Sequence, residues 1–249
     1  MSEPVTPPAD RAAEIAANLA EVRARIAAAC ARADRDPAEV RLLAVTKTFP
    51  AEDAAVLADL GVLDLAENRE QEAGPKAAAV AGLRPESAVR WHMVGRLQRN
   101  KARSVIRWAA EVQSVDSTRL AEALARAVSS ARESGERTGP LDVLLQASVD
   151  GDPARGGCPL DDLGGLADVV IRSSDLRLRG IMAVAPLGME PSAAFARLAS
   201  AAQRLREHYP AARELSCGMS NDLEIAIDYG STCVRVGTAL LGGRGLASP

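Results

Sequence analysis

At 249 residues the chain exceeds the usual size of one domain, but α/β barrels commonly reach this length as a single folding unit. Hydrophobic residues make up 47% and charged residues 25%, which is typical of a globular protein with a filled core. The net charge of -3 provides no broad basic field, which argues against nucleic acid as a partner. We expect one domain over residues 1–249, with residues 1–9 disordered.

Cysteine and histidine residues are too few and too dispersed to predict a metal site. The four cysteines have no CxxC spacing and the chain has only two histidines, so reduced thiols and no metal are expected. The N-terminus lacks the apolar core of a signal peptide, and no apolar run approaches the roughly 20 residues of a membrane-spanning helix. We therefore expect a cytoplasmic protein without a membrane partner.

The first predicted element is an amphipathic helix within residues 11–35, where Ile15, Leu19, Val22 and Ile26 recur at intervals of three and four residues. Short apolar runs then alternate with alanine-rich stretches. Eight strands are expected, at residues 40–46, 62–66, 89–94, 111–115, 142–148, 177–184, 213–217 and 232–236.

Helices are expected to follow these strands. Their predicted ranges are 51–60, 67–81, 97–108, 117–134, 160–173, 190–207, 221–229 and 238–242. Sequential strand and helix units favour a parallel sheet, and eight of them favour closure into an α/β (β/α)8 TIM barrel over an open doubly wound sheet.

Lys47 stands at the end of the first predicted strand, in the stretch LLAVTKTFP (residues 42–50). Loops that follow the strand C-termini form the active face of such a barrel. An ordinary lysine here would be a surface residue that caps a loop or pairs with an acid. Partial desolvation in the barrel mouth would instead leave some of the amine neutral and able to attack an aldehyde.

Small and hydroxyl residues crowd the ends of the last two predicted strands, within residues 217–244. They are Gly218, Ser220, Gly230, Ser231, Thr232, Gly237 and Thr238. Backbone N–H groups, hydroxyls and a helix N-terminus in this part of a barrel can bind phosphate, and Ser220 and Thr238 can donate hydrogen bonds. Turn and capping chemistry explains each glycine individually, but explains their clustering less well.

Arg235 lies in the last predicted strand, on the opposite face from Val234 and Val236. If the valines contact the helices, Arg235 points into the barrel, where an unpaired guanidinium would be costly. Its partner is either an acidic residue of the chain or a heteroaromatic nitrogen of a ligand. Asn68 and His92, near the ends of strands two and three, are expected in the same mouth, although a single histidine often serves only core hydrogen bonding.

Several motifs in chain order carry a family resemblance. They are AVTKT, ENREQE, WHMVGRLQRNK, VQSVDS, LRGIMAV, GMSNDLEIAIDYGST and VRVGTALLG. Together, over residues 43–244, they resemble the pyridoxal phosphate homeostasis protein family. This resemblance implies the barrel of alanine racemase without that enzyme's additional β domain. It also implies binding of pyridoxal 5'-phosphate (PLP) without a well-established reaction.

The resemblance also assigns roles to individual positions. Lys47 matches the lysine that forms the PLP aldimine, and Arg235 matches the arginine that faces the pyridine nitrogen. Ser220, Gly237 and Thr238 match the phosphate-binding positions. Two further positions near the cofactor are those of Asn68 and His92. The chain departs from the family pattern at LAEN (65–68), at Cys217 and in the loop VDGDPARGGC (149–158).

Arg235 would donate to an unprotonated PLP pyridine nitrogen, and an unprotonated ring stabilises a carbanion less well. Racemases of this family type share the arginine, so it does not by itself exclude catalysis. The tyrosine that serves a racemase as second acid/base has no obvious counterpart, since Tyr209 and Tyr229 are not placed at the strand C-termini. We therefore expect a monomeric PLP carrier or buffer that binds the aldehyde reversibly through Lys47, limits free PLP and lacks robust catalysis, with apo-enzymes as candidate recipients. The alternatives are a PLP-dependent racemase or lyase, and an aldolase in which Lys47 attacks a sugar phosphate.

Overall fold

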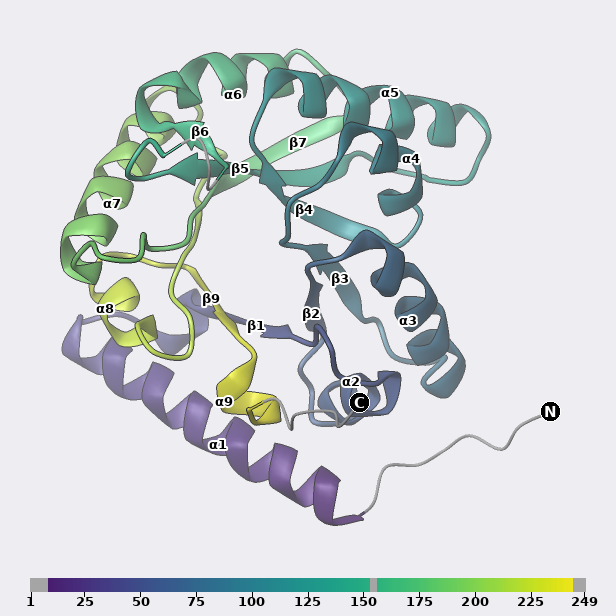
Figure 1. Ribbon diagram of the computed structural model, residues 1–249, viewed down its shortest axis with the longest axis vertical. Helices are drawn as coiled ribbons and strands as arrows, with labels where there is room; N and C mark the ends of the chain where they lie inside the picture. Colours follow the sequence, from purple (N-terminus) through teal and green to yellow (C-terminus); the bar gives the residue numbers. More distant parts are fainter. Residues whose placement is uncertain (1–8, 153–155, 244–249) are drawn as a thin grey trace.

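The computed structural model describes residues 9–152 and 156–243, and parallel strands form a closed barrel at its centre (Figure 1). The strands are β1 Arg41–Val45, β2 Asp64–Glu67, β3 Arg90–Met93, β4 Ala109–Val115, β5 Leu141–Ser148, β6 Cys158–Pro159, β7 Leu176–Met182, β8 Glu214–Ser216 and β9 Cys233–Val236. Eight of them pair in the order β4-β3-β2-β1-β9-β8-β7-β5, and β5 pairs again with β4. This closure confirms the predicted TIM barrel.

Helices surround the barrel, and the long α1 lies alongside α8 and α9 (Figure 1). Their bounds are α1 Ala9–Arg32, α2 Ala51–Asp59, α3 Glu70–Leu83, α4 Ala102–Val105, α5 Thr118–Glu133, α6 Leu163–Ile171, α7 Pro191–His208, α8 Leu223–Asp228 and α9 Thr238–Leu241. The apolar stripe predicted for α1 is buried, since Ile15, Leu19, Val22 and Ile26 are at most 4% exposed. Within the described residues, no helix is both long and apolar enough to cross a membrane.

All eight predicted strands lie within two residues of the observed bounds. The helix predicted over 97–108 is the largest difference, because that segment contains a 3-10 turn, Arg99–Lys101, followed by the single turn of α4. The Arg137 guanidinium donates hydrogen bonds to the carbonyls of Ile106 (2.9 Å) and Ala109 (3.1 Å). A distant side chain thus satisfies two backbone carbonyls where the segment ends and β4 begins. The expected disorder of residues 1–9 falls almost wholly outside the described residues.

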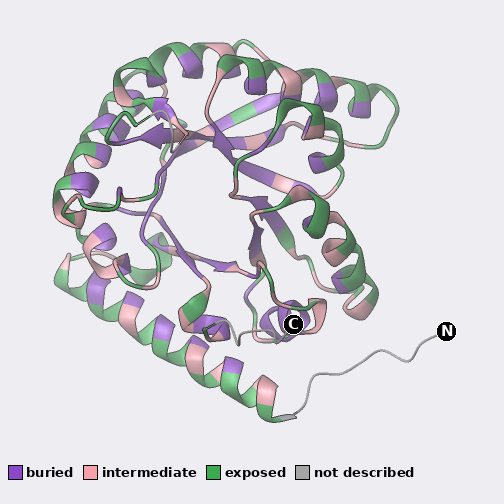
Figure 2. Cartoon of the chain, viewed as in Figure 1, coloured by how far each residue is buried: buried purple, intermediate pink, exposed green. Residues whose placement is uncertain are grey.

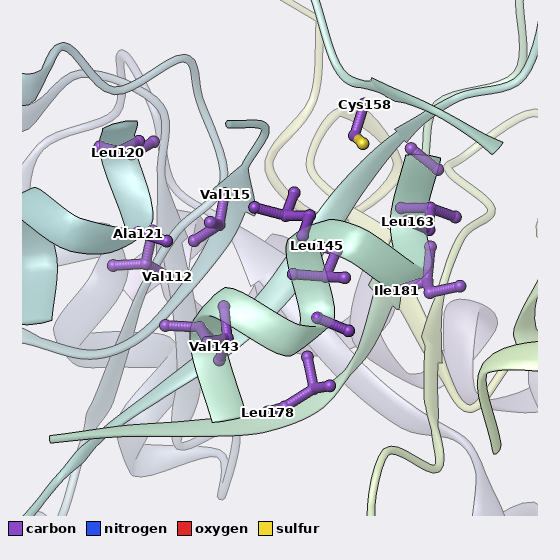
Figure 3. Close-up of a cluster of buried hydrophobic side chains, with 14 of the residues drawn as sticks. Val112, Val115, Leu120, Ala121, Val143, Leu145, Cys158, Leu163, Leu178 and Ile181 are labelled. Carbon is purple, nitrogen blue, oxygen red and sulfur yellow. The ribbon is translucent and has the colours of Figure 1, made fainter. Parts of the chain in front are cut away.

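The main hydrophobic core lies between the barrel and the helices on its outer side. Figure 2 shows buried positions along the strands and on the helix faces that cover them. In Figure 3, Val143 of β5 lies in one cluster with Leu120 of α5 and Leu163 of α6, all at most 3% exposed. Burial of such side chains stabilises the fold by roughly 1.5 to 3 kcal/mol each.

The barrel interior holds a network of charges toward the N-terminal ends of the strands. Arg41 of β1 forms ion pairs with Glu214 (2.7 Å), Glu111 (3.3 Å) and Asp64 (3.4 Å). His92 of β3 lies between Asp64 (2.7 Å) and Glu111 (2.9 Å). Because burying a charge is costly unless it is paired, this mutual pairing explains how the interior tolerates these groups.

Candidate functional site

A cavity of about 640 Å³ opens at the C-terminal end of the barrel, among the loops that follow β1, β2, β3, β7, β8 and β9. This volume lies in the range of small-molecule sites, and the position is that of active sites in TIM barrels. Six of the seven predicted site residues line it: Lys47, Asn68, Ser220, Arg235, Gly237 and Thr238. Another concavity of about 1000 Å³, beside the loops after β3, β4 and β5, is lined by none of them.

Lys47 follows β1 by two residues and is partly buried in the cavity wall. The next residue, Thr48, has φ of 69°, a left-handed conformation that a β-branched residue rarely adopts. Within the described ranges, no carboxylate lies within ion-pairing distance of the Lys47 amine. The amine is thus directed to a cavity rather than to an acidic partner.

Lysine is rare in this chain, which contains three: Lys47, Lys76 and Lys101. The other two are occupied, since the Lys76 amine lies 2.6 Å from Glu67 and the Lys101 amine 3.7 Å from Glu70. Lys47 therefore differs from both in lacking a carboxylate within the described structure.

A buried cluster supports the backbone immediately before Lys47. Lys76 of α3 donates to the Thr46 carbonyl (2.8 Å) and to Glu67 (2.6 Å), and the Thr46 hydroxyl donates to Glu67 (2.7 Å). Glu67 is fully buried at the end of β2. These contacts link the segment before Lys47 to both β2 and α3, which restricts where the amine can point.

Closely packed backbone after β8 and β9 forms the part of the cavity wall next to β1. A Cβ added to Gly218 (φ +91°) would lie 2.6 Å from the Ala226 side chain, so glycine is required there. A Cβ on Gly237 would lie 3.1 Å from the Val45 carbonyl oxygen. The Ser220 hydroxyl accepts a hydrogen bond from the Ala239 N–H (3.3 Å), which connects the two loops.

Helix α1 holds these loops from outside the barrel. Arg25 donates to the Ser220 carbonyl (2.7 Å) and forms an ion pair with Glu224 of α8 (2.7 Å). Asn18 donates to the Leu240 carbonyl of α9 (3.0 Å). The helix that precedes the barrel therefore restrains both the Ser220 loop and the end of α9.

Arg235 points into the barrel, as strand alternation predicts, and is 5% exposed. Its guanidinium donates to the carbonyl (2.7 Å) and hydroxyl (2.8 Å) of Ser216 and to the Ala183 carbonyl (2.8 Å). Burial lowers the pKa of Arg235 from its ordinary value. Across the described residues no acid pairs with this guanidinium, so the acidic partner considered from the sequence is not found there.

Asn68 follows β2 directly and lines the cavity. Its side-chain oxygen is buried and has no hydrogen-bond partner within the described chain. Buried polar atoms are nearly always satisfied in folded proteins, so an unpaired acceptor in a cavity wall indicates a ligand or water.

His92 is the predicted site residue that does not line the cavity. It is fully buried among the interior charges, bonded to Glu111 and Asp64. Burial lowers the pKa of His92, but the hydrogen bonds to Asp64 and Glu111 outweigh it, so the pKa is raised above the ordinary value. Because side chains alternate along a strand, Val94 is the next inward position, and it reaches the cavity instead.

Sequence reasoning missed several residues around the cavity. Ser216 and Gln113 lie behind Arg235, and Glu67 with Lys76 lies behind Lys47. The loop 184–189 after β7 forms another part of the wall. Strand alternation was the available signal for Ser216 and Gln113, since both fall on the inward face of their strands.

Comparisons with known proteins agree with this geometry. Residues 17–245 match the family described as alanine racemase, N-terminal domain. A pyridoxal phosphate homeostasis protein of Mycobacterium tuberculosis is 49% identical over 249 residues, which covers 96% of each chain. The chain belongs to the pyridoxal phosphate homeostasis protein family. The resemblance stated from the motifs is therefore confirmed.

Solved structures support the same membership. An unknown protein from Bifidobacterium adolescentis matches with a TM-score of 0.85 at 30% identity, and the match covers 96% of this chain and 98% of that one. PipY of Synechococcus elongatus PCC7942, solved with PLP bound, has a TM-score of 0.77 at 33% identity, covering 92% and 100%. A relative with this fold has therefore been solved with PLP bound.

Proposed function

We propose that the protein binds PLP reversibly through Lys47 and acts as a carrier or buffer in intracellular PLP homeostasis. One observation carries the proposal. A lysine without a carboxylate partner and an arginine without an acid line the same cavity as two tightly packed loops suited to an anion. The name of the M. tuberculosis relative and the PLP held by PipY support the choice of ligand.

The residues present fit PLP. Lys47 would hold PLP by reversible condensation of its amine with the aldehyde, with water as the leaving group. Ser220, Gly237 and Thr238 bind the phosphate with hydroxyl and backbone N–H donors. Arg235 donates to the pyridine nitrogen, and the unpaired Asn68 oxygen accepts a hydrogen bond from the ligand or from a water beside it.

The surroundings of the cavity favour a carrier over an efficient enzyme. Bound PLP acts as an electron sink most strongly when its ring nitrogen is protonated, and Arg235 cannot supply that proton. Tyr209 and Tyr229 do not line the cavity. They directly follow α7 and α8, and so lie on the N-terminal side of β8 and β9. Among the described residues, neither tyrosine therefore supplies the second acid/base that racemisation requires.

The decisive experiment uses the three lysines. The purified protein is titrated with PLP by visible absorbance, then reduced with borohydride and mapped by peptide mass spectrometry. We expect one labelled peptide, containing Lys47, and loss of both band and label in Lys47→Ala. Lys101→Ala is the matched control and should retain both, because Lys101 lies outside the cavity. A label on Lys76 or Lys101 would contradict the proposal, and a colourless protein that takes up no PLP would favour the aldolase.

A PLP-dependent racemase or lyase is the second candidate, favoured by the match to the alanine racemase family. The PLP-loaded protein is incubated with a panel of L-amino acids, followed by chiral analysis and a keto-acid assay. The carrier proposal predicts no robust turnover. Turnover of about 1 per second or more would show an enzyme.

Delivery of PLP to apo-enzymes and a monomeric state complete the proposal. Transfer is measured as activity gained by an apo-enzyme when a PLP trap consumes free cofactor. Activation that survives the trap supports direct delivery, and activation that disappears supports buffering alone. Sedimentation equilibrium of the loaded protein tests the monomer.

A further inference from the structure

A continuous line of hydrogen bonds runs from Arg235, at the cavity, into the interior charge network. The Arg235 guanidinium donates to the Ser216 hydroxyl (2.8 Å), which donates to the Gln113 side-chain oxygen (2.7 Å). The Gln113 amide donates to Glu111 (2.7 Å), and Glu111 also contacts His92 (2.9 Å). Residues of four strands, β9, β8, β4 and β3, are thereby connected across the barrel.

The chemistry of each group sets the direction of every bond. The pKa of Glu111 is lowered to about 2, since the contacts with His92 and Arg41 outweigh the effect of burial, so the carboxylate only accepts. The Gln113 NH₂ must therefore face Glu111, and its oxygen must face Ser216. The Ser216 hydroxyl then donates to Gln113, which leaves its lone pairs for Arg235.

Water cannot replace a missing member of this line. Glu111, Gln113 and Ser216 are fully buried, and Arg235 is 5% exposed. In such surroundings an unmatched donor or acceptor carries the full cost of its desolvation. The line therefore holds each member in one orientation.

The same bonds determine which N–H donors of Arg235 remain free to face the cavity. A guanidinium has about five N–H donors. Three bonds, to the Ser216 carbonyl, the Ser216 hydroxyl and the Ala183 carbonyl, use the two donors of Nη1 and one of Nη2. The Nε donor and the second Nη2 donor have no acceptor among the described residues, and Arg235 lines the cavity.

We propose that Gln113 is a positioning residue that acts through Ser216 to hold Arg235 with its remaining donors directed at the ligand. Gln113 does not line the cavity, so its influence is indirect. The consequence for PLP rests on the proposed function, whereas the restraint on Arg235 belongs to the chain without ligand. In this arrangement the buried arginine contacts a serine hydroxyl that is held by a buried amide, rather than an acid.

The first arm of the experiment uses ligand-free protein. Hydrogen exchange of the Arg235 Nε–H is measured by NMR in the wild type and in Gln113→Met, which keeps the side-chain length and removes the amide. We expect exchange to accelerate about three- to tenfold in Gln113→Met, since the loss of one restraining hydrogen bond is worth roughly that factor. Unchanged exchange would overturn the proposal.

The second arm measures PLP affinity and the absorbance spectrum in a double-mutant cycle with Arg235→Met. Gln113→Met should weaken binding about three- to tenfold in the wild-type background and by less than about twofold beside Arg235→Met. Equal losses in both backgrounds would show a merely structural role and overturn the proposal. If the wild type takes up no PLP, the proposed function fails, while the exchange arm still decides the role of Gln113.

Two further variants separate the proposed effect from misfolding. Ser114→Ala removes a neighbouring buried hydroxyl of β4 that has no hydrogen-bond partner in the described structure, and should leave exchange and affinity unchanged. If Gln113→Met does not fold, Ser216→Ala enters the same cycle, because it removes the hydroxyl between Gln113 and Arg235. A smaller loss of affinity beside Arg235→Met than in the wild-type background then supports the proposal, and equal losses overturn it.

Discussion

The two ends of the barrel interior differ in whether their charged side chains have ion-pair partners. Toward the strand N-termini, Arg41 contacts three carboxylates and His92 contacts two. At the C-terminal mouth, Lys47 and Arg235 have no carboxylate within the described structure. Pairing, rather than burial or residue type, therefore distinguishes the charges at the two ends, and we infer that the unpaired ones serve a ligand.

Breaking the paired end should have the largest effect. Arg41→Met leaves Glu111, Glu214 and Asp64 without their shared cation, and we expect a loss of about 3 to 5 kcal/mol in unfolding free energy. Urea denaturation measures this loss. Arg177→Met is the control, since the Arg177 side chain is 55% exposed and Asp142 keeps Arg90 at 3.8 Å, so its ion pair should contribute less than about 1 kcal/mol. Similar losses in both variants would remove the distinction between the two ends.

The phosphate loops should show the next largest effect, on binding rather than on stability. Ser220→Ala and Thr238→Ala are each expected to weaken PLP retention by roughly 1.5 to 3 kcal/mol, because each removes a charge-assisted hydrogen bond. Equilibrium dialysis of the single and double variants tests this, with circular dichroism to verify folding. Unchanged affinity in the double variant would mean that the anion binds elsewhere.

The support from α1 should contribute less. Arg25→Met removes the bonds to the Ser220 carbonyl and to Glu224, and PLP affinity should fall by about 1 kcal/mol. Arg32→Met is the matched change on the same helix, since its 3.5 Å pair with Asp228 lies away from the cavity. Equal affinities for the two variants would show that α1 does not influence the site.

The paired end also predicts a pH dependence of stability. The pKa of His92 is raised in the folded chain. Its contribution to folding stability is therefore complete below the ordinary pKa of 6.5, and is lost as the pH rises through the pKa of the folded state. Urea midpoints of the wild type should therefore fall on the alkaline side, and His92→Gln should be flatter. The acidic side is less informative, because the pKa of Glu111 is lowered while burial and Glu111 raise that of Glu214.

The smallest expected effect sharpens the comparison most. Lys47→Met should change unfolding free energy by no more than about 0.5 kcal/mol, since no carboxylate in the described structure loses a partner. Urea denaturation without PLP measures it. A large loss would show that Lys47 is a structural residue of the barrel.

Strand positions and the location of Lys47 at the barrel mouth were predictable because both depend on local order in the chain. Apolar runs mark β1 to β5 and β7 to β9, and Lys47 is identified by following the first of them. The two-residue strand β6 has no such run and was missed. His92 was correctly assigned to β3, but its depth within the barrel depends on the stagger of neighbouring strands, which no single strand reveals.

The sequence by itself therefore determined the fold and the family, and it placed Lys47 after the first strand, since apolar periodicity and motif order are properties of consecutive residues. Only the tertiary structure decided which polar groups are paired. Gln113 and Ser216 are 103 positions apart, and Arg25 and Ser220 are 195 apart. Their contacts arise from barrel closure and helix packing, because hydrogen bonds of this kind depend on distance in space rather than along the chain.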